Sequence, residues 1–137
     1  HCHGREDEVF YVIDGAVELR AGHDRVILNQ GDLLFAPRGV PHQLTNTSDK
    51  STSLLVLLTP GDLESAFIEG SKDLGQLSQA FEESGVVMLK RFDPDFVHPE
   101  VLASDIQPLF VARATERPRY WMAGDTYTVL LPGDAAG

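Results

Sequence analysis

Residues 1–15, HCHGREDEVFYVIDG, place two histidines and a glutamate at the spacing H-x-H-x4-E-x6-G. Residues two apart on a β-strand point to the same face, so His1 and His3 can reach one ion. Cys2 lies between them, should face the other way, and is expected to be a small buried hydrophobe. Glu8 follows after a polar turn and completes a compact group of metal-ligand side chains.

The residues after Glu8 predict two strands joined by a tight turn. The apolar run over 9–13 is rich in β-branched and aromatic residues, and residues 16–20 alternate between apolar and polar types. The Asp-Gly pair between the two runs is a strong turn signal. We therefore expect a β-hairpin over 9–20 with Glu8 at its mouth.

A second block, residues 31–46, GDLLFAPRGVPHQLTN, supplies a fourth ligand at the spacing G-x5-P-x-G-x2-H-x3-N. Two prolines limit the freedom of the bend over 37–41, and Gly39 can take the positive φ that a sharp bend needs. His42 follows the bend directly, which fixes the direction of its side chain. Three imidazoles and one carboxylate are a ligand set that suits a divalent first-row metal.

The two blocks, in this order and with a short interval between them, resemble the two signature motifs of the cupin superfamily. The matching positions are His1, His3, Glu8, Gly15, Gly31, Pro37, Gly39, His42 and Asn46. The resemblance implies a mostly β chain, folded as a double-stranded β-helix (jelly-roll) barrel with one or two short helices packed outside. It also implies that the metal ligands inside the barrel are His1, His3, Glu8 and His42.

A longer resemblance, to small bacterial quercetin 2,3-dioxygenase-like cupins, extends over both blocks and the stretch LLVLLTPGDLESAF, residues 54–67. It implies a metal-dependent dioxygenase, an oxidoreductase that acts on a small enolic or aromatic (flavonol-like) compound with O₂. Glu8 would then be the catalytic base. One divalent transition metal is expected, and Fe, Mn, Ni, Co, Cu and Zn all suit these ligands. Two other functions fit the same motifs: a non-catalytic small-molecule-binding cupin, and a sugar isomerase or epimerase.

The expected site has room for a substrate. Four protein ligands on an octahedral ion leave two positions open, which is the arrangement of a catalytic metal. Phe10 and Val12 share the strand parity of Glu8 and should line a pocket above the ion. Phe35 and Leu44 are expected to join them. An apolar pocket with few polar anchors fits a small aromatic or enolic ligand.

The composition restricts the classes of partner. The 137 residues are enough for one domain with a core of its own. They include 11 Lys and Arg against 21 Asp and Glu, and the net charge of −10 argues against nucleic acid and anionic membranes as partners. No apolar run approaches the ~20 residues of a membrane-spanning helix. The single cysteine excludes an internal disulfide, so a cytoplasmic protein is the simplest expectation.

Four segments are expected along the chain: a barrel core over 1–60, a helical segment over 61–85, an irregular linker over 86–118, and strands over 119–137. The strand over 52–59 is nearly all apolar and is expected to be buried on both faces. The helices, of which the second should span 73–84, are expected to cover the outside of the barrel without a chemical role. His98 is expected to be a solvent-exposed loop residue rather than a further ligand.

The last segment, RYWMAGDTYTVLLPGDAAG, residues 119–137, resembles what usually precedes the first motif in quercetin-dioxygenase-like cupins. Three interpretations are open: a piece of a tandem bicupin, a circular permutation in which 120–131 supplies the N-terminal strands, or a sequence that lacks its true N-terminal residues. We expect 120–131 to complete a barrel, either its own or a partner's. Exchange of strands between two chains would give a homodimer.

Overall fold

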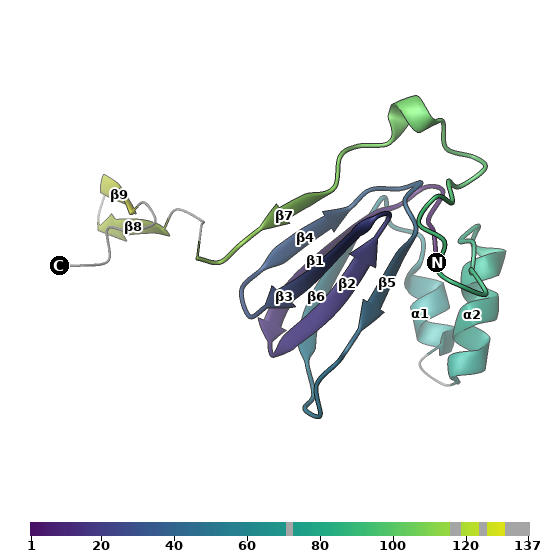
Figure 1. Cartoon of the computed structure of the whole chain (residues 1–137). Coiled ribbons are helices and arrows are strands. Elements are labelled where there is room, and N and C mark those ends of the chain that lie inside the picture. Colours follow the sequence, from purple (N-terminus) through teal and green to yellow (C-terminus); the bar gives the residue numbers. More distant parts are fainter. Residues whose placement is uncertain (71–72, 116–118, 124–125, 131–137) are drawn as a thin grey trace.

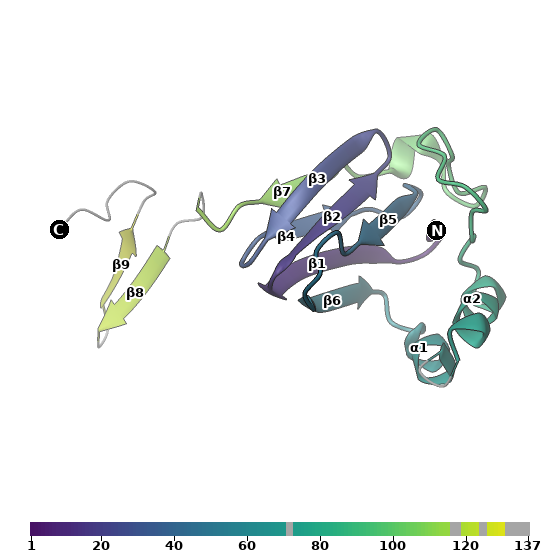
Figure 2. The ribbon, with the colours of Figure 1, turned by 60° about the horizontal axis from the view of Figure 1, so that its bottom comes forward.

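The computed structural model describes residues 1–70, 73–115, 119–123 and 126–130. Within them, two antiparallel sheets face each other and two short helices lie at one end (Figures 1 and 2). The larger sheet has the strand order β6-β1-β4-β7, and the smaller sheet has the order β3-β2-β5. Their strands are β1 (Asp7–Asp14), β2 (Ala16–Ala21), β3 (Asp24–Asn29), β4 (Leu33–Ala36), β5 (His42–Thr45), β6 (Ser53–Thr59) and β7 (Phe110–Ala112). The mostly β, jelly-roll type of fold expected from the sequence is confirmed.

The first two strands do not form the expected hairpin. β1 pairs with β4 and β6, whereas β2 pairs with β3 and β5. The turn at Gly15, whose φ is 85°, therefore carries the chain from one sheet to the other. The physical reason is burial, because the crossing brings Phe10 and Val12 of β1 into one apolar core with the inward side chains of β2.

β6 lies at the edge of the larger sheet, and the expected burial on both of its faces is wrong. It pairs with β1 alone among the described strands. Leu55 and Leu57 are 47% and 54% exposed. An apolar strand is buried on both faces only when neighbours cover both, and the described part of the chain does not supply them.

α1 (Glu64–Gly70) and α2 (Leu74–Glu83) pack on each other and bury a second, smaller apolar cluster. Asp73 caps α2 by accepting a hydrogen bond from the backbone N–H of Gly75 at 2.9 Å. Gly85, with a φ of 86°, follows the end of α2. Both helices lie at the end of the sandwich where residue 1 lies (Figure 1). Among the described residues, no helix is long and apolar enough to cross a membrane.

The C-terminal third adds one strand to the larger sheet and a separate pair of strands. A 3₁₀ turn (Ala103–Asp105) precedes β7, which pairs with β4. β8 (Arg119–Ala123) and β9 (Thr126–Leu130) pair with each other in a two-stranded sheet. Residues 124–125 between them, and residues 131–137, lie outside the described residues. Completion of a barrel by this segment therefore stays a prediction.

Candidate metal centre

Main-chain hydrogen bonds hold residues 1–3 in place before β1 begins. The N–H and C=O groups of Cys2 bond to those of Val87, both at 2.9 Å. On the other side, the N–H of Gly39 donates to the C=O of His3 at 2.8 Å. The bend of the second motif therefore contacts the first motif directly, and the ligand-bearing segments of both meet. Cys2 is fully buried, as its position between two ligands predicted.

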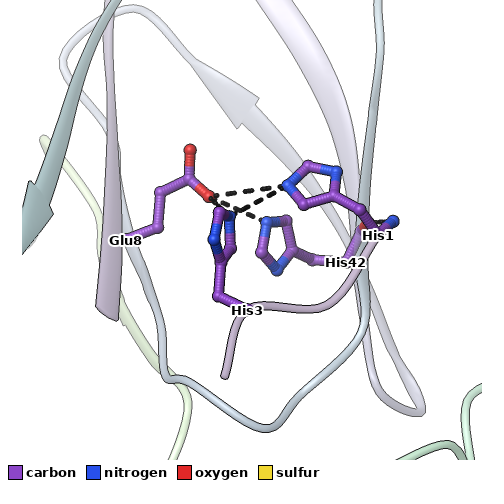
Figure 3. Close-up of side chains that lie close together, drawn as sticks. All are labelled: His1, His3, Glu8 and His42. Carbon is purple, nitrogen blue, oxygen red and sulfur yellow. Dashed lines mark hydrogen bonds and ion pairs between the residues drawn. The ribbon is translucent and has the colours of Figure 1, made fainter. Parts of the chain in front are cut away.

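The four side chains predicted as ligands converge on one point (Figure 3). One ligand atom from each residue lies within 4.8 Å of the others, in the group His1, His3, Glu8 and His42. Oε2 of Glu8 lies 3.1 Å from Nε2 of His3 and 2.8 Å from Nε2 of His42. Nε2 of His1 lies 3.1 Å from Nε2 of His3 and 3.9 Å from Oε2 of Glu8.

These separations are short enough for the four side chains to hold one metal ion. Bonds of about 2.1 Å place neighbouring ligand atoms about 3.0 Å apart and opposite ones about 4.2 Å apart. The separations of 2.8 and 3.1 Å match neighbouring positions, whereas the 3.9 Å between His1 and Glu8 and the 4.8 Å span of the group would require the side chains to shift when an ion binds. The side chain of His1 is 25% exposed, whereas those of His3, Glu8 and His42 are at most 6% exposed. Three of the four side chains are therefore buried, and His1 is the partly exposed member of the cluster.

The outer nitrogens of two histidines also fit metal binding. Nδ1 of His42 lies 3.3 Å from the backbone oxygen of Val40, which can only accept a hydrogen. Nδ1 of His3 is buried, makes no hydrogen bond of good geometry in the described structure, and lies 3.3 Å from Oε2 of Glu6. Without a cation, the Nε2 atoms of His3 and His42 donate to Glu8; when a cation binds, acceptors at both Nδ1 atoms would keep a proton on Nδ1 while Nε2 gives up its own to bind the cation.

The charge on Glu8 suits the same role. Burial alone raises the pKa of this carboxyl, but hydrogen bonds from His3 and His42, together with their charge, outweigh that effect. The pKa of Glu8 falls from 4.5 to about 2. The carboxylate is therefore ionised at neutral pH, the state in which a carboxylate binds a metal.

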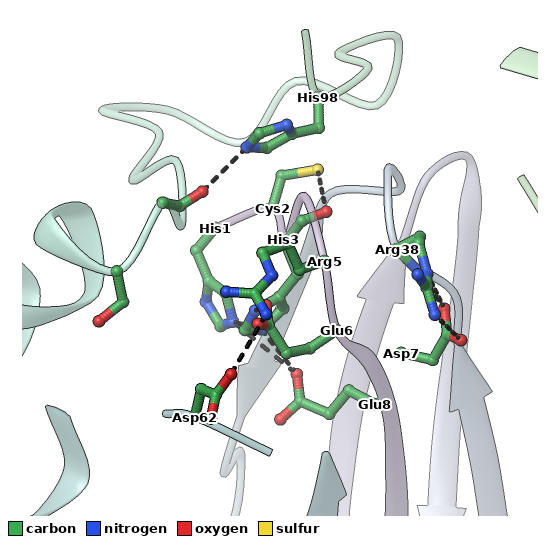
Figure 4. Close-up of polar contacts among 12 residues, drawn as sticks. His1, Cys2, His3, Arg5, Glu6, Asp7, Glu8, Arg38, Asp62 and His98 are labelled. Atoms are coloured by element: carbon green, nitrogen blue, oxygen red, sulfur yellow. Dashed lines mark hydrogen bonds and ion pairs between the residues drawn. The ribbon is translucent and has the colours of Figure 1, made fainter. Parts of the chain in front are cut away.

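An ion pair next to the cluster joins the two motifs (Figure 4). Arg38 donates to Asp7 through Nε at 3.0 Å, through Nη2 at 2.8 Å and through its backbone N–H at 2.9 Å. The side-chain hydrogen bond from Arg38 holds the pKa of Asp7 below its usual value. Because Asp7 precedes Glu8 and Arg38 precedes Gly39, this pair fixes the start of β1 against the bend.

Two of the residues predicted for a substrate pocket lie on the inward face of β1. Phe10 is nearly fully buried, and its ring centroid lies 5.8 Å from that of His42. Val12 is fully buried, but it belongs to the core between the two sheets. Phe10 therefore borders the cluster, whereas Val12 lies two residues further along β1 and packs in the core between the sheets.

The other two predicted pocket residues are placed differently. Phe35 pairs with Val9 and so lies on the face opposite Glu8, which corrects its expected inward position. The error arises because the pairing of β4 with β1 decides which β4 side chains point inward. That pairing cannot be read from the β4 sequence alone. Leu44 shares the inward parity of His42, yet it is 40% exposed near the end of β5.

Two residues near the cluster escaped the sequence analysis. The ring of Phe81 on α2 is buried, and its centroid lies 5.9 Å from that of His1. The helices therefore border the candidate site, which corrects the expectation that they only cover the outside. Glu6, beside His3, is only 2% exposed, and its place in a charged turn gave no sign of this burial.

His98 is also corrected by the structure, because it is 3% exposed. Its Nε2 donates to the backbone oxygen of Gly85 at 3.0 Å, and its Nδ1 accepts from the N–H of Glu100 at 3.2 Å. The ring covers Gly4, where a Cβ atom would lie 2.5 Å from it. Both ring nitrogens are used, so His98 holds a loop over the first motif and is not a ligand.

The comparisons with known proteins agree with this geometry. Residues 1–58 match the family model described as the cupin domain. The match includes both motifs and every strand from β1 into β6. A search of curated proteins finds no match to this chain. The match over residues 1–58 and the cluster of three histidines and a glutamate together support a metal-binding cupin domain in this part of the chain.

Proposed function

We propose that this cupin is a metal-dependent dioxygenase that acts on a small enolic or aromatic, flavonol-like compound. The observation that carries the proposal is the convergence of three imidazoles on a buried, ionised carboxylate, with one ligand atom of each residue within 4.8 Å of the others. One divalent transition metal, when bound there, would supply Lewis acidity and a place for O₂ and substrate. The resemblance of the sequence to quercetin-dioxygenase-like cupins supports the choice of reaction.

The residues around the cluster support a small aromatic or enolic substrate. The open side lies at His1, so a substrate would approach past this ring. Phe10 and Phe81 border the cluster with apolar surface and contact His42 and His1. Apolar walls would exclude water and stack on a planar ring. A sugar isomerase or epimerase needs polar groups for many hydroxyls, which these walls do not offer.

The role of Glu8 is chiefly that of a ligand in this proposal. A general base works best when its pKa lies near the operating pH. The pKa of Glu8 is about 2 in the metal-free cluster, which makes it a weak base in that state. Its predicted role as catalytic base would require a substrate hydroxyl to replace the hydrogen bond from His3 or His42.

Oxygen consumption tests the proposal. The metal-replete protein is mixed with flavonols, catechols and enolic diketones, and uptake is followed with an oxygen electrode while the products are identified by mass spectrometry. We expect uptake with at least one class, abolished by His42→Ala. The matched control is His23→Ala, because His23 is exposed on the surface. Tight binding of these compounds without uptake would instead favour the non-catalytic small-molecule-binding cupin.

A further inference from the structure

The loop over 85–106, which we call the cover loop, contacts both metal motifs at the end of the sandwich where residue 1 lies (Figure 1). Its contacts are made to two glycines that adjoin the ligand His3. Gly4 follows His3 in the chain, and the ring of His98 covers it. Gly39 donates its N–H to the backbone oxygen of His3 at 2.8 Å, and its own oxygen accepts from the N–H of His98 at 3.4 Å. A single residue of the cover loop therefore reaches both neighbours of this ligand.

Hydrogen bonds fix the ring of His98 in the cover loop. Its Nε2 donates to the backbone oxygen of Gly85 at 3.0 Å, and its Nδ1 accepts from the N–H of Glu100 at 3.2 Å. The residue is buried. A buried ring whose two nitrogens are both bonded is held in one orientation, so it presents a fixed surface to Gly4.

The contact with His98 leaves no room for a side chain at position 4. A Cβ on Gly4 would lie 2.5 Å from Cε1, 2.8 Å from Nδ1 and 2.9 Å from Nε2 of the ring. The φ of Gly4 lies outside the left-handed region, so its backbone conformation does not require glycine. The close approach of the ring is therefore the physical reason for a glycine next to the ligand.

This contact acts on the ligand His3 from the side opposite the cluster. In Figure 4 the segment that carries His3 runs between the ring of His98 and the carboxylate of Glu8. Nε2 of His3 lies 3.1 Å from Oε2 of Glu8. Metal ligands must be held within about 0.5 Å of their working positions, so a small shift of the backbone at Gly4 would matter for binding.

We propose that His98 is a positioning residue of the metal centre. Through its contacts with Gly4 and Gly39, it holds the backbone of His3 where a bound ion requires it. The role falls outside residues 1–58, which match the cupin domain, and so adds a contribution from the second half of the chain to the site. The inference rests on the metal binding in the proposed function and does not depend on the reaction.

A double-variant cycle on Gly4 and His98 tests this role. Affinities for Zn²⁺ and Co²⁺ are measured by competition with a chromophoric chelator. His98→Ala should weaken them by roughly tenfold or more, the size of effect that residues outside the ligand set commonly have. Gly4→Ala should weaken them at least as much, because its methyl group collides with the ring. In the double variant the collision is gone, so the affinities should equal those of His98→Ala.

Val17→Ala is the control that separates positioning from a general loss of stability. Val17 is buried in the core between the sheets, and it lies about 13 Å along β2 from Ala21, the residue that pairs with His42. Its loss should lower the unfolding midpoint of the metal-free chain. The metal affinity of a chain that remains folded should stay unchanged, because stability alone does not move the ligands.

The absorption spectrum of bound Co²⁺ gives a second readout, because it depends on the geometry of the ligands. The spectrum should change in His98→Ala and stay as in the wild type in Val17→Ala. If Gly4→Ala does not fold, a double variant that folds and binds metal is the expected rescue.

Two results would overturn the positioning role. One is wild-type affinity and an unchanged Co²⁺ spectrum in His98→Ala. The other is a double variant in which the two losses add, because Gly4 and His98 would then act independently. A folded wild type that binds neither ion would refute the metal centre, and the role of His98 with it. Normal metal affinities without oxygen uptake would refute only the proposed reaction.

Discussion

Oε2 of Glu6 lies 3.3 Å from Nδ1 of His3, and both side chains are at most 3% exposed. A carboxylate at this position would hold the proton of His3 on Nδ1, leave Nε2 free, and make the ring a better ligand. We therefore expect Glu6→Gln to weaken metal affinity by about 10–100-fold. Competition with a chromophoric chelator measures this change for several divalent ions.

The control for this change is Glu82→Gln, because Glu82 is exposed on α2. It should leave metal affinity unchanged. The unfolding midpoint of each metal-free variant shows whether a lower affinity reflects a change at His3 or a loss of the folded structure. If Glu6→Gln leaves the metal affinity unchanged, the contact between Glu6 and His3 does not affect metal binding.

Metal content should depend on all four ligands. The purified wild type is expected to carry about one divalent ion per chain, and Glu8→Ala or His42→Ala should remove most of it. His23→Ala, at an exposed position, should keep the wild-type content. Elemental analysis by mass spectrometry gives the answer, and full metal content in either ligand variant would refute the assigned site.

The low pKa of Glu8 predicts how the metal-free fold responds to acid. A carboxyl whose pKa is lower in the folded chain stabilises the fold above its unfolded pKa. For Glu8 the contribution is complete above pH 4.5 and is lost as the pH falls towards 2. Urea unfolding across this range should show a shallower loss of stability for Glu8→Gln than for the wild type. Parallel pH dependence in the two proteins would contradict the assigned shift.

The ion pair between Asp7 and Arg38 should contribute more to the free energy of unfolding than an exposed ion pair does. Asp7→Ala removes two side-chain hydrogen bonds and one backbone hydrogen bond from Arg38, so we expect a loss of about 1–2 kcal/mol in the free energy of unfolding. Arg5→Ala removes a pair with Asp62 in which both side chains are more than half exposed, and should change little. Urea titration compares the two variants, and equal losses would argue against a special role for Asp7.

Two glycines with the same backbone conformation separate strain from crowding. The φ of Gly39 is 82° and that of Gly85 is 86°, so alanine is strained at both. A Cβ on Gly39 would lie 2.8 Å from Cγ1 of Val101, whereas nothing lies within 4 Å at Gly85. Gly39→Ala should therefore destabilise by at least about 1 kcal/mol more than Gly85→Ala.

Gly39→Ala should also weaken metal binding, because Gly39 donates its N–H to the backbone oxygen of the ligand His3. Gly85→Ala should not. Calorimetric unfolding and metal titration of both variants test the two statements together. Equal destabilisation by the two substitutions would show that Val101 moves away from the added methyl group without a loss of stability.

The thiol of Cys2 should be unreactive in the folded protein. Burial raises the pKa of Cys2 to about 11, and the residue is fully buried. The thiolate is the reactive form, so a thiol-specific dye should label Cys2 at pH 8 only after unfolding by urea. Rapid labelling of the native chain would show that Cys2 is accessible, which would contradict its burial and its backbone pairing with Val87.

The sequence was enough to select the four side chains that converge in the structure and to predict the strand character of the chain, because side chains two apart on a strand share a face. His1 and His3 could be paired from spacing alone, and the rigid bend before His42 predicted where a fourth ligand would point. Gly15 was recognised as a turn, but whether it joined two neighbouring strands or two opposite sheets depended on which arrangement buries Phe10.

Only the tertiary structure decided the contacts between segments distant in the sequence. The inward or outward position of Phe35 depends on its register with Val9, and the burial of His98 depends on a loop that folds over Gly4. The exposure of β6 depends on the lack of a second neighbouring strand among the described residues. Local spacing fixes which side chains share a face, whereas burial is a property of the neighbours that the fold brings to that face.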